Sequence, residues 1–422
     1  MTDIFDLKDT IKWLFALRNK SSRLGLERIE KLAKLVENPQ KNFPSIHVAG
    51  TNGKGSLCAM LESIYRSNSY KVGLFTSPHL LKINERIQIN RVSISDRDLC
   101  LQVKELRKLI LENFSSKCYP SFFEFITLIA FKYFSDHSVD IALIETGLGG
   151  RLDATNIIKP QLSIITSIGL DHTEILGDNI KSIAKEKAGI IKKNIPVIIG
   201  KISNEAEIVI KQIAKEKNAP FYDVKKFSTN NSPCINLKGT YQKSNAQLAV
   251  AATQILFKKF PVNCIESLKD VNWPGRWQAI KLETKKIILD STHNEEACLQ
   301  LEENLESLKK KESKKPIVIV GILGMNRARS LMPLLCKHAR KIYIIVPNQP
   351  RACTKEELIS VIPQGCTIDI FSSTIKEAFS YNKCNIGTDR DTILVTGSIY
   401  LIGEVLTKIK GLPGDPIGQD LI

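Results

Sequence analysis

Short, nearly continuous apolar runs recur along the chain, separated by longer stretches with a helical apolar period. Such runs are typical of parallel strands whose two faces are both covered. We expect strands at residues 45–50, 71–77, 139–147, 161–169, 195–200, 286–292, 315–323, 341–347 and 391–398. Helices are expected at 56–68 and 120–137, and the alternation of strands with helices predicts an α/β fold.

A chain of 422 residues is long enough to bury two separate cores. Pro-Gly and charged residues interrupt the pattern at WPGRWQAIKLETKK, residues 273–286, and residues of these types mark turns. We therefore expect a first domain of residues 1–278 and a smaller second domain of residues 279–422.

The formal net charge of +16 suits nucleic acid, an anionic membrane surface or small polyanionic substrates. The basic residues are scattered, however, and the dense run KKKESKK at 309–315 lacks interleaved aromatic residues on which bases stack. We favour a charge spread over solvated faces and expect neither a nucleic acid nor a membrane as a partner.

Ten cysteines occur singly, without a C-x-x-C pair, which argues against a thiolate zinc site and a secreted disulfide framework. Charged residues break up the first twenty positions, and no apolar stretch approaches transmembrane length. We expect a cytoplasmic protein, and a monomer.

The segment HVAGTNGKGSL, residues 47–57, places a glycine-rich loop between an expected strand and an expected helix. In the common phosphate loop the lysine and the hydroxyl residue are adjacent, whereas here Gly55 separates Lys54 from Ser56. Glycines let backbone N–H groups approach phosphates, and a helix N-terminus adds a favourable dipole. We expect Lys54 to neutralise phosphates and Ser56 to offer an oxygen to Mg²⁺ or phosphate. A plain glycine turn is the alternative.

Further motifs follow in order: SPHLLKINERIQIN (77–90), IETGLGGRLDATNI (144–157), GLDHTEILGDNI (169–180), AKEKAGI (184–190), PGRW (274–277), HNEEA (293–297) and TGSIYLIGEV (396–405). With GTNGKGS, they make the chain resemble the folylpolyglutamate synthase/dihydrofolate synthase family of the Mur ligase superfamily over most of its length. The resemblance implies a P-loop-containing, Mur-ligase-like central ATPase domain followed by a smaller Rossmann-like α/β domain. It also makes the extra glycine the normal form of this loop.

The resemblance implies a magnesium site as well. Glu145 ends an expected strand, where α/β sheets place functional groups, although its residue type alone fits a capping or ion-paired role equally well. By resemblance, Glu145, Ser56 and Ser77 reach one Mg²⁺ and His172 binds a second. Lys187 is carbamylated in this reading and helps to hold Mg²⁺ as an anion. The alternatives are a structural histidine and a solvated helix lysine.

ATP is expected between the two domains, which implies a closing motion. By resemblance, the ATP-binding residues are Gly50, Thr51, Asn52, Gly53, Lys54, Gly55, Ser56, Asn245, Arg276, Asp290 and His293, and the catalytic residues are Lys54, His172 and Lys187. Taken singly, the residues beyond the loop fit a helix cap, a surface arginine and a strand-end turn. Asp153 and Ala154 are expected near the pterin of a folate-type substrate, the alternative being a turn with Asx capping.

The second domain departs from the family at two places. Glu295 stands where a proline is common after HN, and GMNRARS (324–330) replaces an Asp-Lys-Asp-like acidic cluster. Arg327 or Arg329 is therefore a candidate to hold a carboxylate of glutamate.

Amide formation from a carboxylate and an amine needs an activated acyl group, which ATP can supply as an acyl phosphate. We expect an ATP- and Mg²⁺-dependent ligase that adds L-glutamate to dihydropteroate, to a tetrahydrofolate-type polyglutamate, or to both. A bifunctional enzyme is favoured over a folylpolyglutamate synthase alone. A basic, nucleic-acid-associated P-loop ATPase leaves Glu145 and His172 unexplained. A ligase of cell-wall precursors usually has a further N-terminal domain, for which the residues before the loop are too few.

Overall fold

The computed structural model describes residues 6–17, 25–115, 118–227, 235–257 and 263–412. Its first sheet consists of β1 (Ser45–Ala49), β2 (Val72–Phe75), β3 (Ile87–Ile89), β4 (Val92–Ser93), β5 (Ile141–Glu145), β6 (Leu162–Ile165), β7 (Val197–Ile199) and β8 (Phe221–Asp223). The strand order is β4-β3-β2-β5-β1-β6-β7-β8, with parallel pairing from β2 to β8 and antiparallel pairing at β3 and β4. The chain leaves β1 toward β2 on one side and later enters β6 on the other. The carboxyl end of β1 is therefore the switch point at which α/β sheets bind ligands.

Helices cover both faces of this sheet. They are α1 (Leu7–Ala16), α2 (Glu27–Leu35), α3 (Lys54–Ser67), α4 (Asp96–Asn113), α5 (Phe122–Asp136), α6 (Thr173–Leu176), α7 (Ile180–Ala188), α8 (Asn204–Glu216) and α9 (Thr240–Leu256). Alternate residues of β5 pack on opposite sides: Ile141 and Leu143 join the core under α3 and α9, while Ala142 and Ile144 join the core under α5. This period of two explains why the strands read as continuous apolar runs.

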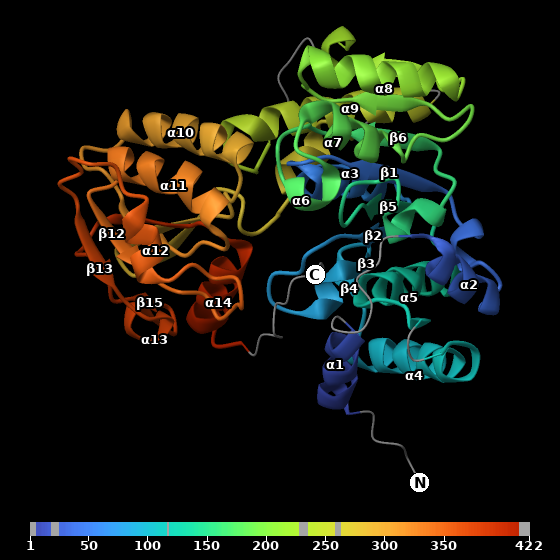
Figure 1. Cartoon of the computed structure of the whole chain (residues 1–422), viewed down its shortest axis with the longest axis horizontal. Coiled ribbons are helices and arrows are strands. Elements are labelled where there is room, and N and C mark those ends of the chain that lie inside the picture. Colours follow the sequence, from blue (N-terminus) through green and yellow to red (C-terminus); the bar gives the residue numbers. More distant parts are fainter. Residues whose placement is uncertain (1–5, 18–24, 116–117, 228–234, 258–262, 413–422) are drawn as a thin grey trace.

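The second sheet lies beside the first (Figure 1). Its strands are β9 (Gln278–Leu282), β10 (Lys285–Asp290), β11 (Ile317–Val320), β12 (Lys341–Ile344), β13 (Asp369–Ser372) and β16 (Thr392–Thr396), in the order β13-β12-β11-β16-β10-β9. Only the β9–β10 pair among these is antiparallel. The remaining elements are the hairpin β14 (Phe379–Ser380) and β15 (Lys383–Cys384), and the helices α10 (Glu295–Lys309), α11 (Met325–His338), α12 (Lys355–Ser360), α13 (Ile375–Ala378) and α14 (Ile399–Lys410).

The expected α/β fold is confirmed, and each expected strand overlaps an observed one. The short strands β3, β4, β8, β9 and β13 were not expected, because they are too short or too mixed in polarity to form apolar runs. The boundary between residues 278 and 279 falls at the start of β9 and stays a prediction. No helix in the described part of the chain is long and apolar enough to cross a membrane.

Candidate active site

The glycine-rich loop leads from the carboxyl end of β1 into helix α3. Gly53 caps the helix with φ of 86°, a left-handed conformation that favours glycine. A Cβ at this position would lie 2.7 Å from Oδ1 of Asn245 in α9. The glycine cap has no side chain to bond the first N–H groups of α3, and the first turn contains no acidic residue. This helix end is therefore suited to an anion.

The side chains of the loop are held from both sides. The Lys54 Nζ donates to the backbone oxygens of Gly50 (3.0 Å) and Thr51 (3.3 Å), so the lysine folds over the loop. The hydroxyl of Ser56 accepts from Nε2 of Gln242 in α9 (3.1 Å). Both residues lie where the motif predicts, at the head of α3.

The extra glycine of the loop has a steric reason. A Cβ on Gly55 would lie 3.1 Å from Cζ2 and Nε1 of Trp273, so the indole ring lies directly against the loop. Trp273 belongs to the segment that joins the two sheets, and the guanidinium of Arg91 lies 5.2 Å from its ring centroid. Arg91 also donates to the backbone oxygen of Asn272 (2.7 Å). The connection between the domains is thus packed directly onto the phosphate loop.

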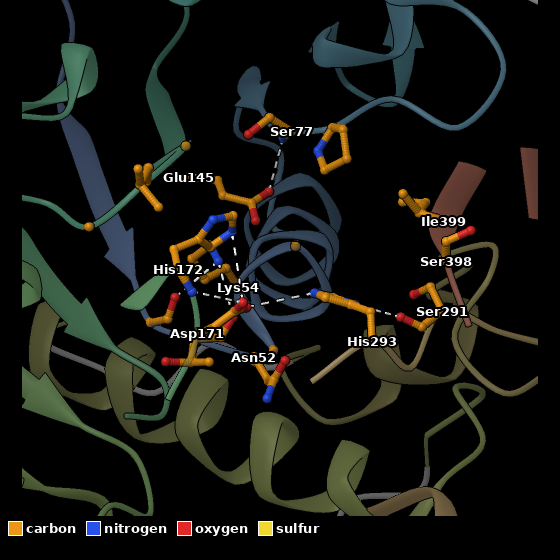
Figure 2. A pocket seen from close by; sticks show the side chains of 18 of the residues that line it. Asn52, Lys54, Ser77, Glu145, Asp171, His172, Ser291, His293, Ser398 and Ile399 are labelled. Carbon is orange, nitrogen blue, oxygen red and sulfur yellow. Dashed lines mark hydrogen bonds and ion pairs between the residues drawn. The ribbon is translucent and has the colours of Figure 1, made fainter. Parts of the chain in front are cut away.

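A cavity of about 180 Å³ opens over the loop, and both domains line it. Figure 2 shows Lys54, Glu145 and His172 from the first domain facing His293, Ser291 and Ser398 from the second. The predicted residues that line it are Gly50, Thr51, Asn52, Gly53, Lys54, Gly55, Ser77, Glu145, His172, Lys187, Arg276 and His293.

Three predicted residues line neighbouring cavities. Ser56 and Asp290 line a small one of about 30 Å³, and Asn245 lines one of about 400 Å³; both of these share Asn52 and Gly53 with the main cavity.

Asp153 and Ala154 are buried and do not line the three cavities. The carboxylate of Asp153 accepts from the backbone N–H groups of Gly147 (2.9 Å) and Leu148 (2.8 Å), and from the hydroxyl of Thr155. It therefore holds the loop that follows Glu145. The contact of Asp153 and Ala154 with a substrate stays a prediction.

Glu145 is a carboxylate enclosed at the end of β5. Burial raises its pKa to about 7, although Lys54, the N–H of Ser77 and Arg276 act against this rise. The Ser77 backbone N–H donates to Glu145 Oε2 at 3.2 Å (Figure 2). A cation bound at this carboxylate would therefore offset a large cost of burying its charge.

Lys187 is buried in the last turn of α7 rather than solvated. Burial lowers the pKa of Lys187 to about 7, and the charge of Lys54 adds to the effect. Its Nζ donates to the backbone oxygen of Gly50 at 2.9 Å. The alternative of a surface lysine is thus wrong, and the amine is available in its neutral form near neutral pH.

Asp171 lies in the motif GLDHTEILGDNI, but it was not among the predicted site residues. Figure 2 shows it between two predicted residues, with Oδ1 3.9 Å from His172 Nε2 and Oδ2 3.8 Å from His293 Nε2. Burial alone would raise the pKa of Asp171, but His293, His172 and Arg327 hold it below its usual value. Burial lowers the pKa of His172, and it lowers that of His293 to about 4.

The loop itself contacts the second domain. Asn52 Nδ2 donates to Asn294 Oδ1 (3.1 Å) and to Glu296 Oε2 (2.8 Å), and Asn294 Nδ2 returns a bond to Asn52 Oδ1 (3.0 Å). The hydroxyl of Ser167 also donates to Glu296 Oε2 (3.1 Å). The roles of Asn294 and Glu296 were not predicted from the HNEEA motif, because their shared partner Asn52 lies more than 200 residues away along the chain.

The side chains around the cavity suit Mg²⁺, which takes several of its ligands from water and phosphate, better than a metal ion held entirely by protein side chains. In the described residues, no group of three or more His, Cys, Asp and Glu side chains could hold a metal ion. Mg²⁺ usually takes one or two carboxylates and completes its shell with water and substrate phosphates. The buried carboxylate of Glu145, which lines the cavity together with the phosphate loop, is compatible with that chemistry.

Replacing Gly55 with alanine should weaken ATP binding, because the added methyl group displaces Trp273 or the loop. Overpacking of this kind costs about 1–3 kcal/mol, and the dissociation constant of ATP, measured by calorimetry, reports it. The loss should shrink when Gly55→Ala is made together with Trp273→Phe. Equal losses in both backgrounds would contradict the steric explanation.

Lys187 should form a carbamate with CO₂ because its amine loses its proton near neutral pH. The neutral amine attacks CO₂, and the carbamate forms with release of one proton. With ¹³C-bicarbonate, a protein-bound carbamate signal should grow between about pH 6 and about pH 8, far below the pH that an ordinary lysine requires. The signal should vanish in Lys187→Met and persist in Lys185→Met, an exposed neighbour. Its persistence in Lys187→Met would refute the assignment.

Comparison with known proteins agrees with this geometry. Residues 121–280 match the Mur ligase middle domain, and residues 275–399 match the Mur ligase, glutamate ligase domain. The dihydrofolate synthase/folylpolyglutamate synthase of Bacillus subtilis is 32% identical, with 96% of this chain and 99% of that protein aligned.

Two solved structures are similar over nearly their whole length. Folylpolyglutamate synthase of Mycobacterium tuberculosis complexed with ADP is 26% identical at a TM-score of 0.84, with 95% of this chain and 98% of that one covered. The bifunctional enzyme of Yersinia pestis, complexed with AMPPNP and a manganese ion, is 26% identical at a TM-score of 0.81, with coverage of 95% and 97%. The chain belongs to the folylpolyglutamate synthase/dihydrofolate synthase family of Mur ligases.

Proposed function

We propose that this protein is an ATP-dependent ligase that joins L-glutamate to the carboxylate of a folate-type acid. The observation that carries the proposal is the cavity over the phosphate loop, because cations from both domains converge there. Lys54 comes from the first domain, Arg276 from the connection and Arg327 from the second domain. Such a set suits a reaction in which negative charge is transferred and redistributed.

We place the nucleotide between the two domains, in the cavities that residues of both domains line. Its phosphates lie on the N-terminal turn of α3, near Lys54 and Arg276, both of which line the main cavity. Its base and sugar extend into the cavity of about 400 Å³, which Asn245 and Tyr241 line and which meets the main cavity at Gly53. This placement accounts for Asn245, which lies outside the main cavity.

The acid substrate approaches the terminal phosphate from the open side of the loop. Its carboxylate oxygen takes the phosphoryl group, ADP leaves, and the amine of glutamate then attacks the acyl carbon and releases phosphate. Lys54 and Arg276 stabilise charge on the phosphoryl oxygens during the first step. The walls of the closed cavity exclude water, which would otherwise hydrolyse the acyl phosphate.

One Mg²⁺ would be held by Glu145 with Ser56 and Ser77, and a second by His172, while carbamylated Lys187 would help to hold Mg²⁺. Bound there, the ions would supply positive charge to the phosphate oxygens. The raised pKa of Glu145 and the neutral amine of Lys187 support these roles. A cytoplasmic location, a monomeric state and the absence of nucleic-acid and membrane partners remain predictions.

The choice between a bifunctional enzyme and a folylpolyglutamate synthase alone depends on the acid. ADP release from the purified protein with Mg²⁺ and ATP should require both L-glutamate and a folate-type acid. Dihydropteroate and tetrahydrofolate, each tested with and without glutamate, separate the two activities. Turnover stimulated by RNA and indifferent to glutamate would support a nucleic-acid-associated ATPase and overturn the proposal.

Lys54→Ala should reduce glutamate-dependent ADP release by roughly 100-fold or more, as expected when a preorganised charge at the reacting group is removed. Lys34→Ala, on the exposed side of α2, is the matched control and should leave turnover unchanged. Near-normal ligation by Lys54→Ala would show that the loop does not bind the reacting phosphates.

A further inference from the structure

Arg327 connects the second domain to the loop that follows β6. It lies in the first turn of α11, and its Nη2 is 3.3 Å from Oδ1 of Asp171. Both side chains are mostly buried, with 20% of Arg327 and 13% of Asp171 exposed. The two residues are 156 positions apart in the chain, so the ion pair forms only when the domains meet.

The carboxylate of Asp171 also contacts two other residues of the second domain. Asn294, the N-cap of α10, donates through Nδ2 to Asp171 Oδ2 at 3.1 Å, and His293 Nε2 lies 3.8 Å from the same oxygen. One carboxylate of the first domain thus faces the starts of two helices, α10 and α11, of the second. His172, the next residue in the chain, approaches the carboxylate from the first domain's side (Figure 2).

We propose that Arg327 is a positioning residue, which closes the second domain onto the phosphate-loop domain by pairing with Asp171. The ligase reaction that it serves rests on the proposed function, whereas the pairing itself does not depend on the substrate. The sequence made Arg327 a candidate receptor for a glutamate carboxylate. The structure gives its guanidinium a carboxylate partner within the protein, and that partner favours a role in closure over one in substrate binding.

A control residue in the same domain separates closure from general charge. Lys309 is exposed in the last turn of α10. Removal of Lys309 therefore changes the net charge as removal of Arg327 does but leaves the contact between the domains intact.

Steady-state kinetics provide the first test. Arg327→Gln should lower kcat at least roughly tenfold, a typical size for coupling between two sites, with the KM for glutamate changed less than about twofold. Lys309→Gln should match the wild type, and Arg327→Lys should recover part of the loss because it keeps the charge. Arg327→Gln should add little to the loss caused by Asp171→Asn, because both break the same pair. A selective rise in the KM for glutamate at unchanged kcat would overturn the proposal and make Arg327 a substrate receptor.

Small-angle X-ray scattering provides a second test that needs no turnover. With ADP and Mg²⁺ present, Arg327→Gln should be more extended than the wild type, and Lys309→Gln should not. Equal compactness of all three proteins would overturn the proposed closure. If the wild type ligates no folate-type acid, the proposed function fails while the scattering comparison still decides the role of Arg327.

Discussion

The site depends on a phosphate loop that is bonded to both domains at once. Asn52 exchanges hydrogen bonds with Asn294, while Trp273 of the connecting segment lies against Gly55. A loop held only by its own domain would bind phosphates without sensing the second domain. Here the second domain is bonded directly to the anion site, so the proposed nucleotide binding would be coupled to domain closure.

Burial between the two domains shifts the pKa values of acidic and basic side chains in opposite directions. It raises the pKa of Glu145 and lowers that of Lys187, bringing both to about 7, because each charged form loses its hydration. A cation at the carboxylate and a modified amine would restore the lost stabilisation. Under the proposed function, the region between the domains would therefore favour states in which metal and nucleotide are present, as expected of a site that closes around its substrates.

The sequence predicted the parts of the site that local pattern determines. The loop around Lys54 and the strand-end residue Glu145 each follow a buried strand, and the family resemblance supplied the expected role of Glu145. The pairing of Asp171 with Arg327 was not, because it joins residues far apart in the chain through the contact of two domains. The reason for Gly55 was also hidden, since it depends on where Trp273 packs. The strands β4 and β9 escaped detection because they lie at sheet edges and carry mixed polarity, and β3 because it is only three residues long.

We propose that ATP lies between the domains on this loop. A crystal structure of the protein with Mg²⁺ and a non-hydrolysable ATP analogue would test this position. We expect the triphosphate on the backbone amides that begin α3, with Lys54 and Arg276 both in contact with it and the base near Asn245. A nucleotide bound elsewhere, or one that contacts the first domain alone, would contradict it.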